Sequence, residues 1–196
     1  YDNILPALML KYQATEKQSL RFVASKTITL PEFKELAPFE YVSPTGRVTK
    51  GNPDLVKSDN YNFDLKWEFF PDRGELFSVT GFYKMINDPI NRTQTRGSSG
   101  NFYFANTGER ADVYGVEAEA RFGIIKAETT GTPDLNMTLN ATKMWHNQDL
   151  FEIFQYNSKT ETELQGAAGF IFNGALSYST NTDNEFQATL TGNYSS

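Results

Sequence analysis

The sequence predicts an all-β fold, namely a segment of an antiparallel, up-and-down transmembrane β-barrel with about eight strands, short periplasmic turns and long extracellular loops. Three observations lead to this prediction. Within several segments, polar and apolar residues alternate. The connections between these segments are short and long in turn. Aromatic residues gather beside the short connections. No segment approaches the ~18 uninterrupted apolar residues of a membrane helix, so any crossing of a membrane would use strands.

The alternation is clearest in residues 60–69. The polar members are Asn60, Asn62, Asp64, Lys66 and Glu68, and the apolar members are Tyr61, Phe63, Leu65, Trp67 and Phe69. The same pattern recurs in residues 8–14, 20–24, 77–85, 114–122, 135–141, 170–178 and 186–194. Because successive side chains of a strand point to opposite faces, each range is predicted to be an amphipathic strand.

The connections between these strands differ systematically in length. Residues 15–18, 71–74 and 181–184 are predicted tight turns, and residues 125–134 form a somewhat longer link. Between them lie three long connections, Lys26 to Val56, Asn87 to Asp112 and Asn147 to Ala168. Long loops are uncommon in a compact soluble domain, whereas short turns at one end and long loops at the other are typical of outer-membrane barrels.

The two faces of the strands fit the same interpretation. The apolar faces carry aromatic residues beside the short turns, as in an interfacial girdle: Tyr12, Phe69, Phe77, Phe122, Tyr178 and Phe186. The opposite faces carry charged residues predicted to face a wet lumen, where charge costs little: Asp64, Lys66, Glu68, Glu117, Glu119 and Arg121. Ion pairs along the barrel wall are the simplest role for this set.

Composition excludes several functions. The 18 basic and 24 acidic residues give a net charge of −6, which leaves no basic excess for binding nucleic acid. The chain contains no cysteine and one histidine, so we expect no catalytic residue, no metal site and no cofactor. His146 is expected to make ordinary hydrogen bonds at a loop base.

Two alternatives remain open at this point. A soluble, secreted β-sandwich that acts as a binding module would bury Phe63, Leu65 and Trp67 in a dry core and expose Lys66. A barrel-embedded hydrolase would require His146 to meet a nucleophile or a carboxylate.

The long connections also hold candidate ligand-binding residues. Aromatic rings with a guanidinium suit a chelate, a sugar or a peptide. The candidates are Phe33, Phe39, Tyr41, Arg47, Tyr103 and Phe154. Packing of one loop on another is the alternative role for these side chains.

Four segments, in order along the chain, carry a family resemblance. They are residues 25–39 (SKTITLPEFKELAPF), residues 51–68 with GNPDL and NFDLKWE, residues 82–90 (FYKMINDPI), and residues 106–119 with NTG and YGVEAE. Together they resemble TonB-dependent outer-membrane receptors, in a form similar to those of the Bacteroidetes.

The resemblance implies a barrel of about 22 strands, closed by an N-terminal plug domain. Such a receptor lies in the bacterial outer membrane, in contact with its lipid, binds a scarce nutrient at its extracellular loops, and imports it with energy from TonB. A metal chelate such as a siderophore, a cobalamin-like cofactor and an oligosaccharide are all consistent with it. The charged lumen residues named above would then be candidates for contacts with the plug. Residues 1–196 are expected to form part of one barrel domain, in its C-terminal half, without the plug, the signal peptide or the terminal strands.

Overall fold

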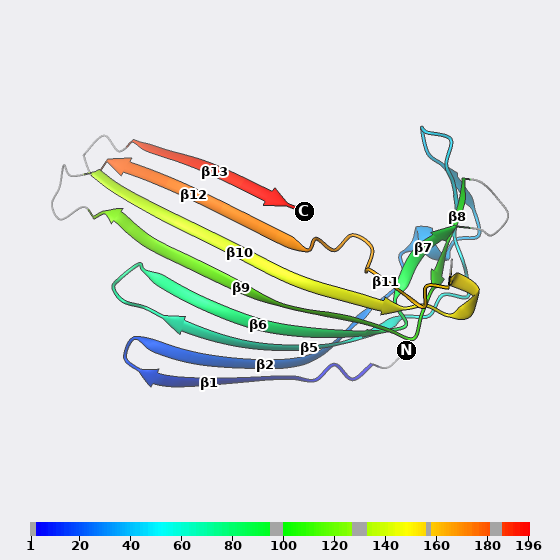
Figure 1. Ribbon diagram of the computed structural model, residues 1–196, viewed down its shortest axis with the longest axis horizontal. Helices are drawn as coiled ribbons and strands as arrows, with labels where there is room; N and C mark the ends of the chain where they lie inside the picture. Colours follow the sequence, from blue (N-terminus) through cyan, green and yellow to red (C-terminus); the bar gives the residue numbers. More distant parts are fainter. Residues whose placement is uncertain (1–2, 95–99, 127–132, 156–157, 181–185) are drawn as a thin grey trace.

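The computed structural model describes residues 3–94, 100–126, 133–155, 158–180 and 186–196. Within these ranges the chain forms one long curved antiparallel sheet, and a second small sheet stands at one end of it (Figure 1).

The long sheet is an antiparallel meander. In the described part of the chain its strand order is β1-β2-β5-β6-β9-β10-β12-β13, and the short β11 adds to β10. The bounds are β1 Ala7–Thr15, β2 Gln18–Thr29, β5 Ser58–Phe69, β6 Leu76–Asn87, β9 Arg110–Ile125, β10 Pro133–Asp149, β11 Glu161–Thr162, β12 Phe170–Thr180 and β13 Gln187–Ser195. Each long strand thus pairs with the next one in the sequence, which confirms the predicted up-and-down topology.

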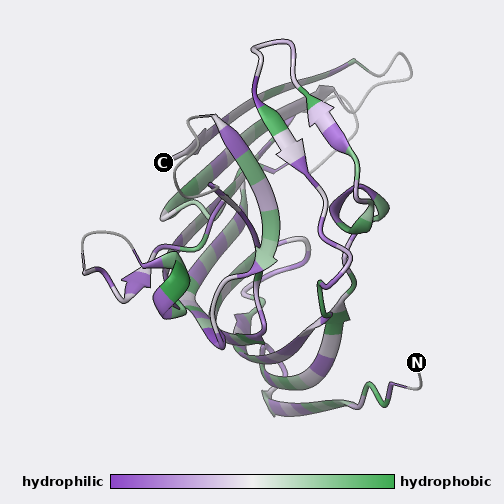
Figure 2. Ribbon diagram, turned by 90° about the vertical axis from the view of Figure 1, so that its right-hand side faces the viewer, coloured by the Kyte–Doolittle hydropathy of each residue, from purple (hydrophilic) through white to green (hydrophobic). Residues whose placement is uncertain are grey.

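The register of the sheet places the predicted apolar residues on one face. Phe22 lies opposite Leu65, Leu65 opposite Gly81, and Gly81 opposite Val116. The ribbon coloured by hydropathy accordingly shows alternating bands along the long strands (Figure 2). All eight predicted strands are present with the predicted apolar and polar faces.

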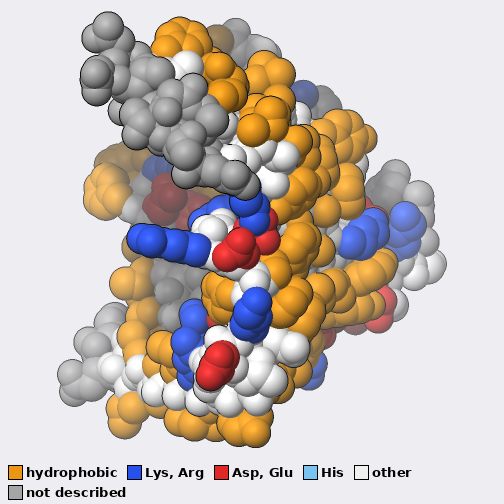
Figure 3. All heavy atoms as spheres, turned by 90° about the vertical axis from the view of Figure 1, so that its left-hand side faces the viewer, with side chains coloured by type: hydrophobic (Ala, Val, Ile, Leu, Met, Phe, Trp, Pro, Cys, Tyr) orange, Lys and Arg blue, Asp and Glu red, His pale blue; other side chains and the backbone are white. Residues whose placement is uncertain are grey.

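The apolar face is not covered by a second layer among the described residues. Leu65 is 55% exposed and Leu190 is 73% exposed, values that a dry protein core would not allow. Seen from the turn end, charged side chains gather in the hollow of the curved sheet, with hydrophobic side chains around it (Figure 3). The soluble-sandwich alternative is therefore wrong, because a sandwich packs its apolar face against a second sheet.

Two of the predicted tight turns lie within the described residues and are present. Glu16 and Lys17 join β1 to β2, and residues 70–75 join β5 to β6. Lys126 Nζ closes the second turn with ion pairs to Asp72 (3.0 Å) and Glu75 (2.8 Å). The predicted turn at 181–184 lies outside the described residues, as do residues 127–132 of the longer link.

The long connections contain a second sheet that the sequence did not predict. Its order is β3-β4-β8-β7, with β3 Glu40–Val42, β4 Val48–Lys50, β7 Ile90–Gln94 and β8 Asn101–Asn106. A short helix, α1 Phe33–Leu36, precedes β3, and a 3₁₀ turn, η1 Glu152–Phe154, follows β10. We call β3, β4, β7 and β8 the loop sheet; in Figure 1 it stands beyond the ends of β5, β6, β9 and β10.

Candidate functional site in the loop sheet

The loop sheet is tied to the long sheet through the side chain of Asn106. The Asn106 Oδ1 accepts a hydrogen bond from the Val56 backbone N–H (3.0 Å), and its Nδ2 donates to the carbonyl oxygens of Val56 (3.1 Å) and Asp88 (2.8 Å). Asp88 itself has a left-handed backbone, with φ of 54°. One amide therefore joins the ends of two different loops above the barrel wall.

A buried polar cluster makes a second attachment. Asn91 of β7, Thr107 after β8 and Gln148 of β10 are each at most 9% exposed. Asn91 Nδ2 donates to Thr107 Oγ1 (2.8 Å) and to Gln148 Oε1 (2.8 Å), and Gln148 Nε2 donates to Thr107 Oγ1 (2.6 Å). Because buried polar groups are costly unless paired, this closed set favours a single arrangement of the second and third loops.

Two glycines allow close approach of backbone to backbone. A Cβ on Gly51 would lie 1.9 Å from the Ala37 carbonyl oxygen, and one on Gly108 would lie 2.0 Å from the Asp149 carbonyl oxygen. No residue with a side chain fits either position. The loops thus form a fixed platform, because each is attached to another at a point that tolerates little change.

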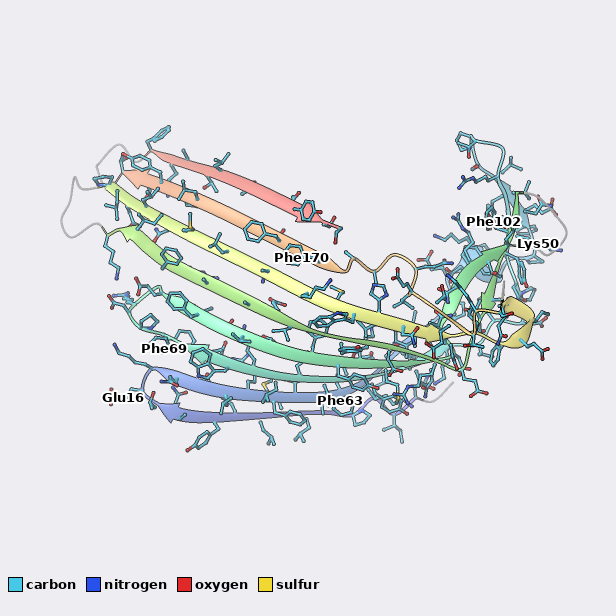
Figure 4. All side chains as sticks on the ribbon, in the orientation of Figure 1. Glu16, Lys50, Phe63, Phe69, Phe102 and Phe170 are labelled. Atoms are coloured by element: carbon cyan, nitrogen blue, oxygen red, sulfur yellow. The ribbon has the colours of Figure 1, made fainter. Side chains whose placement is uncertain are left out.

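One face of the loop sheet gathers aromatic rings and a cation. Across the strands Tyr41 lies opposite Thr49, Thr49 opposite Phe102, and Arg92 opposite Phe104. The Arg92 guanidinium lies over the Phe102 ring, 5.0 Å from its centre. We call Tyr41, Thr49, Arg92, Phe102 and Phe104 the aromatic face; Phe102 is labelled on the loop sheet in Figure 4.

The six residues predicted to bind the ligand lie at different places in the structure. Tyr41 belongs to the aromatic face, whereas Tyr103 points to the other face of β8, where its ring lies 6.4 Å from that of Phe154. Phe33 on α1 and Phe39 before β3 are 81% and 61% exposed. Arg47 lies in the β3–β4 turn, where its backbone N–H donates to Ser43 Oγ (3.0 Å). The Tyr103–Phe154 pair is the loop-on-loop packing foreseen as the alternative.

Arg92 and Phe102 were not among the predicted candidates. Their pairing depends on the register of β7 and β8, which are five and six residues long and carry no alternation strong enough to reveal it. A further cation, Lys34 on α1, is held by Glu32 at 2.8 Å, and that hydrogen bond raises the pKa of the Lys34 ammonium.

Most of the predicted lumen charges form one ion chain on the inner face of the long sheet. Arg21 pairs with Glu68 (3.3 Å), Lys66 lies between Glu68 (3.7 Å) and Glu119 (3.8 Å), and Arg121 pairs with Glu119 (3.3 Å).

The two remaining predicted lumen residues behave differently. Glu117 accepts a hydrogen bond from Asn140 Nδ2 (2.7 Å). Within the described ranges Asp64 has no ion-pair partner.

The single histidine makes a hydrogen bond to the backbone of the third loop. His146 Nδ1 accepts a hydrogen bond from the Leu164 backbone N–H (3.2 Å), which is the ordinary role expected for it. No cluster of three or more His, Cys, Asp or Glu side chains in the described ranges could hold a metal ion. Likewise, no described helix is long and apolar enough to cross a membrane.

The family model for the β-barrel of TonB-dependent receptor-like proteins matches residues 1–196, the whole chain. The chain belongs to the TonB-dependent receptor β-barrel family. Its members are receptors and transporters of the outer membrane of Gram-negative bacteria, so this chain is an outer-membrane β-barrel segment. No curated protein sequence matches the chain.

Several solved structures share the fold. The siderophore receptor PirA from Pseudomonas aeruginosa is 16% identical, with a TM-score of 0.63 over 98% of this chain and 34% of PirA. A variant of the ferric enterobactin receptor PfeA from the same species, in complex with enterobactin, is 22% identical, with a TM-score of 0.65 over 96% of this chain and 28% of PfeA. The FrpB iron transporter from Neisseria meningitidis is 13% identical, with a TM-score of 0.59 over 98% of this chain and 27% of FrpB. The chain thus spans about a third of these receptors or less.

Proposed function

We propose that this chain supplies wall strands and ligand-binding loops to an active-transport receptor that takes up an anionic ferric chelate. The observation that carries the proposal is the aromatic face, where Arg92 is stacked on Phe102 with Tyr41 on the same face. Planar aromatic rings and a guanidinium suit a ligand that is aromatic and negatively charged. The PirA and PfeA receptors, which share the fold, are described as siderophore and ferric enterobactin receptors, and this favours a ferric chelate over the cobalamin-like cofactor and the oligosaccharide.

The way the loops and the wall are built supports this transport function. The loops are held in place by Asn106 and by the Asn91–Thr107–Gln148 cluster, so a ligand would meet a preformed surface and lose little binding energy to loop ordering. A plug domain of the parent protein would close the lumen, and TonB would supply the energy to move it. The ion chain from Arg21 to Arg121 leaves charged groups on the lumen wall that a plug could contact, and Asp64, which has no ion-pair partner in the described ranges, is a further candidate.

The proposal is tested with the full-length receptor. Binding of ferric catecholate, cobalamin and an oligosaccharide is measured by fluorescence titration of the purified protein in detergent, and uptake is measured in a strain lacking the gene. The expected result is binding of the ferric chelate alone, with growth on it as iron source dependent on both the receptor and TonB.

The variant that tests the site is Arg92→Gln. It removes the charge and the guanidinium that lies over Phe102 but keeps a shorter polar side chain, and we expect chelate affinity to fall by at least about tenfold. Arg73→Gln, in the turn at the opposite end of the strands, is the matched control and should bind normally. Equal affinity of the two variants would exclude the aromatic face as the binding site. Growth that depends on the receptor with an oligosaccharide, but not with the chelate, would show that the proposed ligand class is wrong.

A further inference from the structure

The inner face of the long sheet divides into a charged part and an uncharged part. The ion chain from Arg21 to Arg121 lies on β2, β5 and β9. On β12 and β13, and on β10 between Asn136 and Met144, every inward side chain is uncharged. We call the following small polar stretch the neutral wall: Asn136, Thr138, Asn140 and Thr142 of β10, Asn173, Ala175 and Ser177 of β12, and Thr189, Thr191 and Asn193 of β13.

The register shows that the ion chain and the neutral wall share one face. Glu119 lies opposite Asn140, Asn140 opposite Asn173, and Asn173 opposite Asn193. One row of the sheet therefore passes from a carboxylate of the ion chain to three consecutive amides. Asn140 Nδ2 donates a hydrogen bond to Glu117 (2.7 Å), which marks the border between the two parts. In Figure 1 the neutral wall belongs to the side of the sheet formed by β10, β12 and β13.

Polar groups follow one another along each strand of the neutral wall. From the loop end to the turn end, β12 presents Asn173, Ala175 and Ser177 on the inner face. The Ser177 and Thr189 hydroxyl oxygens lie 3.2 Å apart, across β12 and β13. In the described ranges the side-chain amides of Asn173 and Asn193 have no hydrogen-bond partner, so their N–H groups are available to a molecule in the lumen.

An anionic molecule meets different forces on the two parts of the inner face. On the ion chain it would compete with carboxylates for cations and would be repelled by Glu68 and Glu119. Hydrogen bonds to charged groups contribute about 1.5–3 kcal/mol, whereas those between neutral groups contribute about 0.5–1.5 kcal/mol. On the neutral wall the molecule would exchange one weak hydrogen bond for the next. Conduction through a pore requires such binding, weak enough at each point for release.

We propose that the neutral wall lines the passage of the anionic ferric chelate through the lumen, and that the ion chain does not. This rests on the proposed function, because the chelate is the cargo of that function. The absence of inward charge on these three strands spares an anion both repulsion and capture. The amides of Asn173 and Asn193 supply neutral donors to its oxygen atoms.

The charge of the neutral wall is tested with Asn173→Asp in the full-length receptor. The variant replaces an amide by a carboxylate of nearly the same size, which repels an anion. We expect the initial rate of uptake of a radiolabelled ferric catecholate to fall about tenfold. Affinity at the loops, measured by fluorescence titration, should stay unchanged. Asn62→Asp is the matched control, because Asn62 lies on the inner face of β5 opposite Lys84, and its uptake should stay within about twofold of the native rate.

The width of the passage is tested separately with Ala175→Trp, which should slow uptake to a similar extent without changing affinity. Thr80→Trp, on the inner face of β6 between Lys66 and Glu117, adds a side chain of the same size beside the ion chain and should import normally. Heat-modifiable gel mobility verifies that each barrel is closed, and Asn173→Asp decides the question if Ala175→Trp does not fold.

Two failures are distinguishable in this experiment. If the native receptor imports the ferric catecholate and Asn173→Asp imports it equally fast, or if both aspartate variants lose uptake equally, the assignment of the passage to the neutral wall is overturned while the transport function stands. If the native receptor neither binds nor imports the ferric catecholate, the proposed function itself is wrong, and the passage assigned to its cargo is overturned with it.

Discussion

Gly108 and Asn106 show at the scale of single residues why the motif Asn106-Thr107-Gly108 is a useful family signature. Asn106 bonds two loop ends, the Thr107 hydroxyl joins the buried cluster, and Gly108 lies against the backbone of Asp149. None of the three contributes to the aromatic face. The motif therefore identifies the architecture of the loops, and the residues proposed to bind the ligand lie outside it.

The substitution Gly108→Ala tests this structural role. Its methyl group would overlap the Asp149 carbonyl oxygen, so β9 or β10 has to shift, and we expect a loss of about 1–3 kcal/mol in the free energy of unfolding. Urea unfolding of the full-length receptor in micelles measures the change. Gly192→Ala, where the methyl group meets open space, should unfold within about 0.5 kcal/mol of the native protein. If the two alanine variants unfold alike, the close approach at Gly108 is not a constraint.

At the scale of elements, the long strands and the loop sheet depend on different kinds of information. Each long strand has one side toward water and one side toward lipid, so polar and apolar residues alternate along it. This pattern is visible in the sequence, and all eight strands could therefore be predicted together with their polar and apolar faces. The loop sheet pairs β4 with β8 in parallel across some fifty residues of chain, and three-residue strands such as β3 and β4 carry no periodic signal. For the same reason the sequence could name Tyr41 and Tyr103 as candidates but could not show that they lie on opposite faces.

The attachment of β7 to β10 leads to a second prediction. Gln148→Leu leaves the side chain of Asn91 without its Gln148 partner in a buried site, at a cost of about 1–3 kcal/mol. We expect faster hydrogen exchange in residues 89–94 and 101–107 of the full-length receptor, measured by mass spectrometry, with little change in β5 and β6. Gln165→Leu removes an exposed bond to the Arg92 carbonyl and serves as the control. Exchange that rises equally in both variants would mean that the buried cluster does not anchor the loop sheet.

For the whole molecule, the outward face has two aromatic belts. The belt at the turn end, with Phe77 stacked on Phe122 at 6.2 Å, could be predicted because each ring lies beside a short turn. The belt at the loop end consists of Phe63, Tyr83, Tyr114 and Trp145, and it becomes visible only when the register aligns these residues from four strands. From Phe63 in the loop-end belt to Phe69 beside the turn the chain rises about 20 Å at ~3.4 Å per residue, or about 16 Å after a tilt of ~40°, so both belts fit within the ~25 Å apolar band of such barrels.

Because the two faces alternate, neighbouring residues of one strand should respond in opposite ways to the same substitution. Val79 points outward between the two aromatic belts and is 44% exposed on the uncovered face, whereas Thr80 points inward and lies opposite Lys66 and Glu117. Val79→Arg would place a cation among acyl chains, at a cost of about 2–4 kcal/mol near the midplane. Thr80→Arg would place it in a wet lumen beside the Glu117 carboxylate, where we expect a change of less than about 1 kcal/mol.

Refolding of the full-length receptor into lipid vesicles, followed by heat-modifiable gel mobility, separates these outcomes. The folded fraction should fall sharply for Val79→Arg and stay near that of the native receptor for Thr80→Arg. The opposite order would require the apolar face to line the interior of the barrel. A contrast between two adjacent residues thus tests the orientation of the strands on which the transport proposal depends.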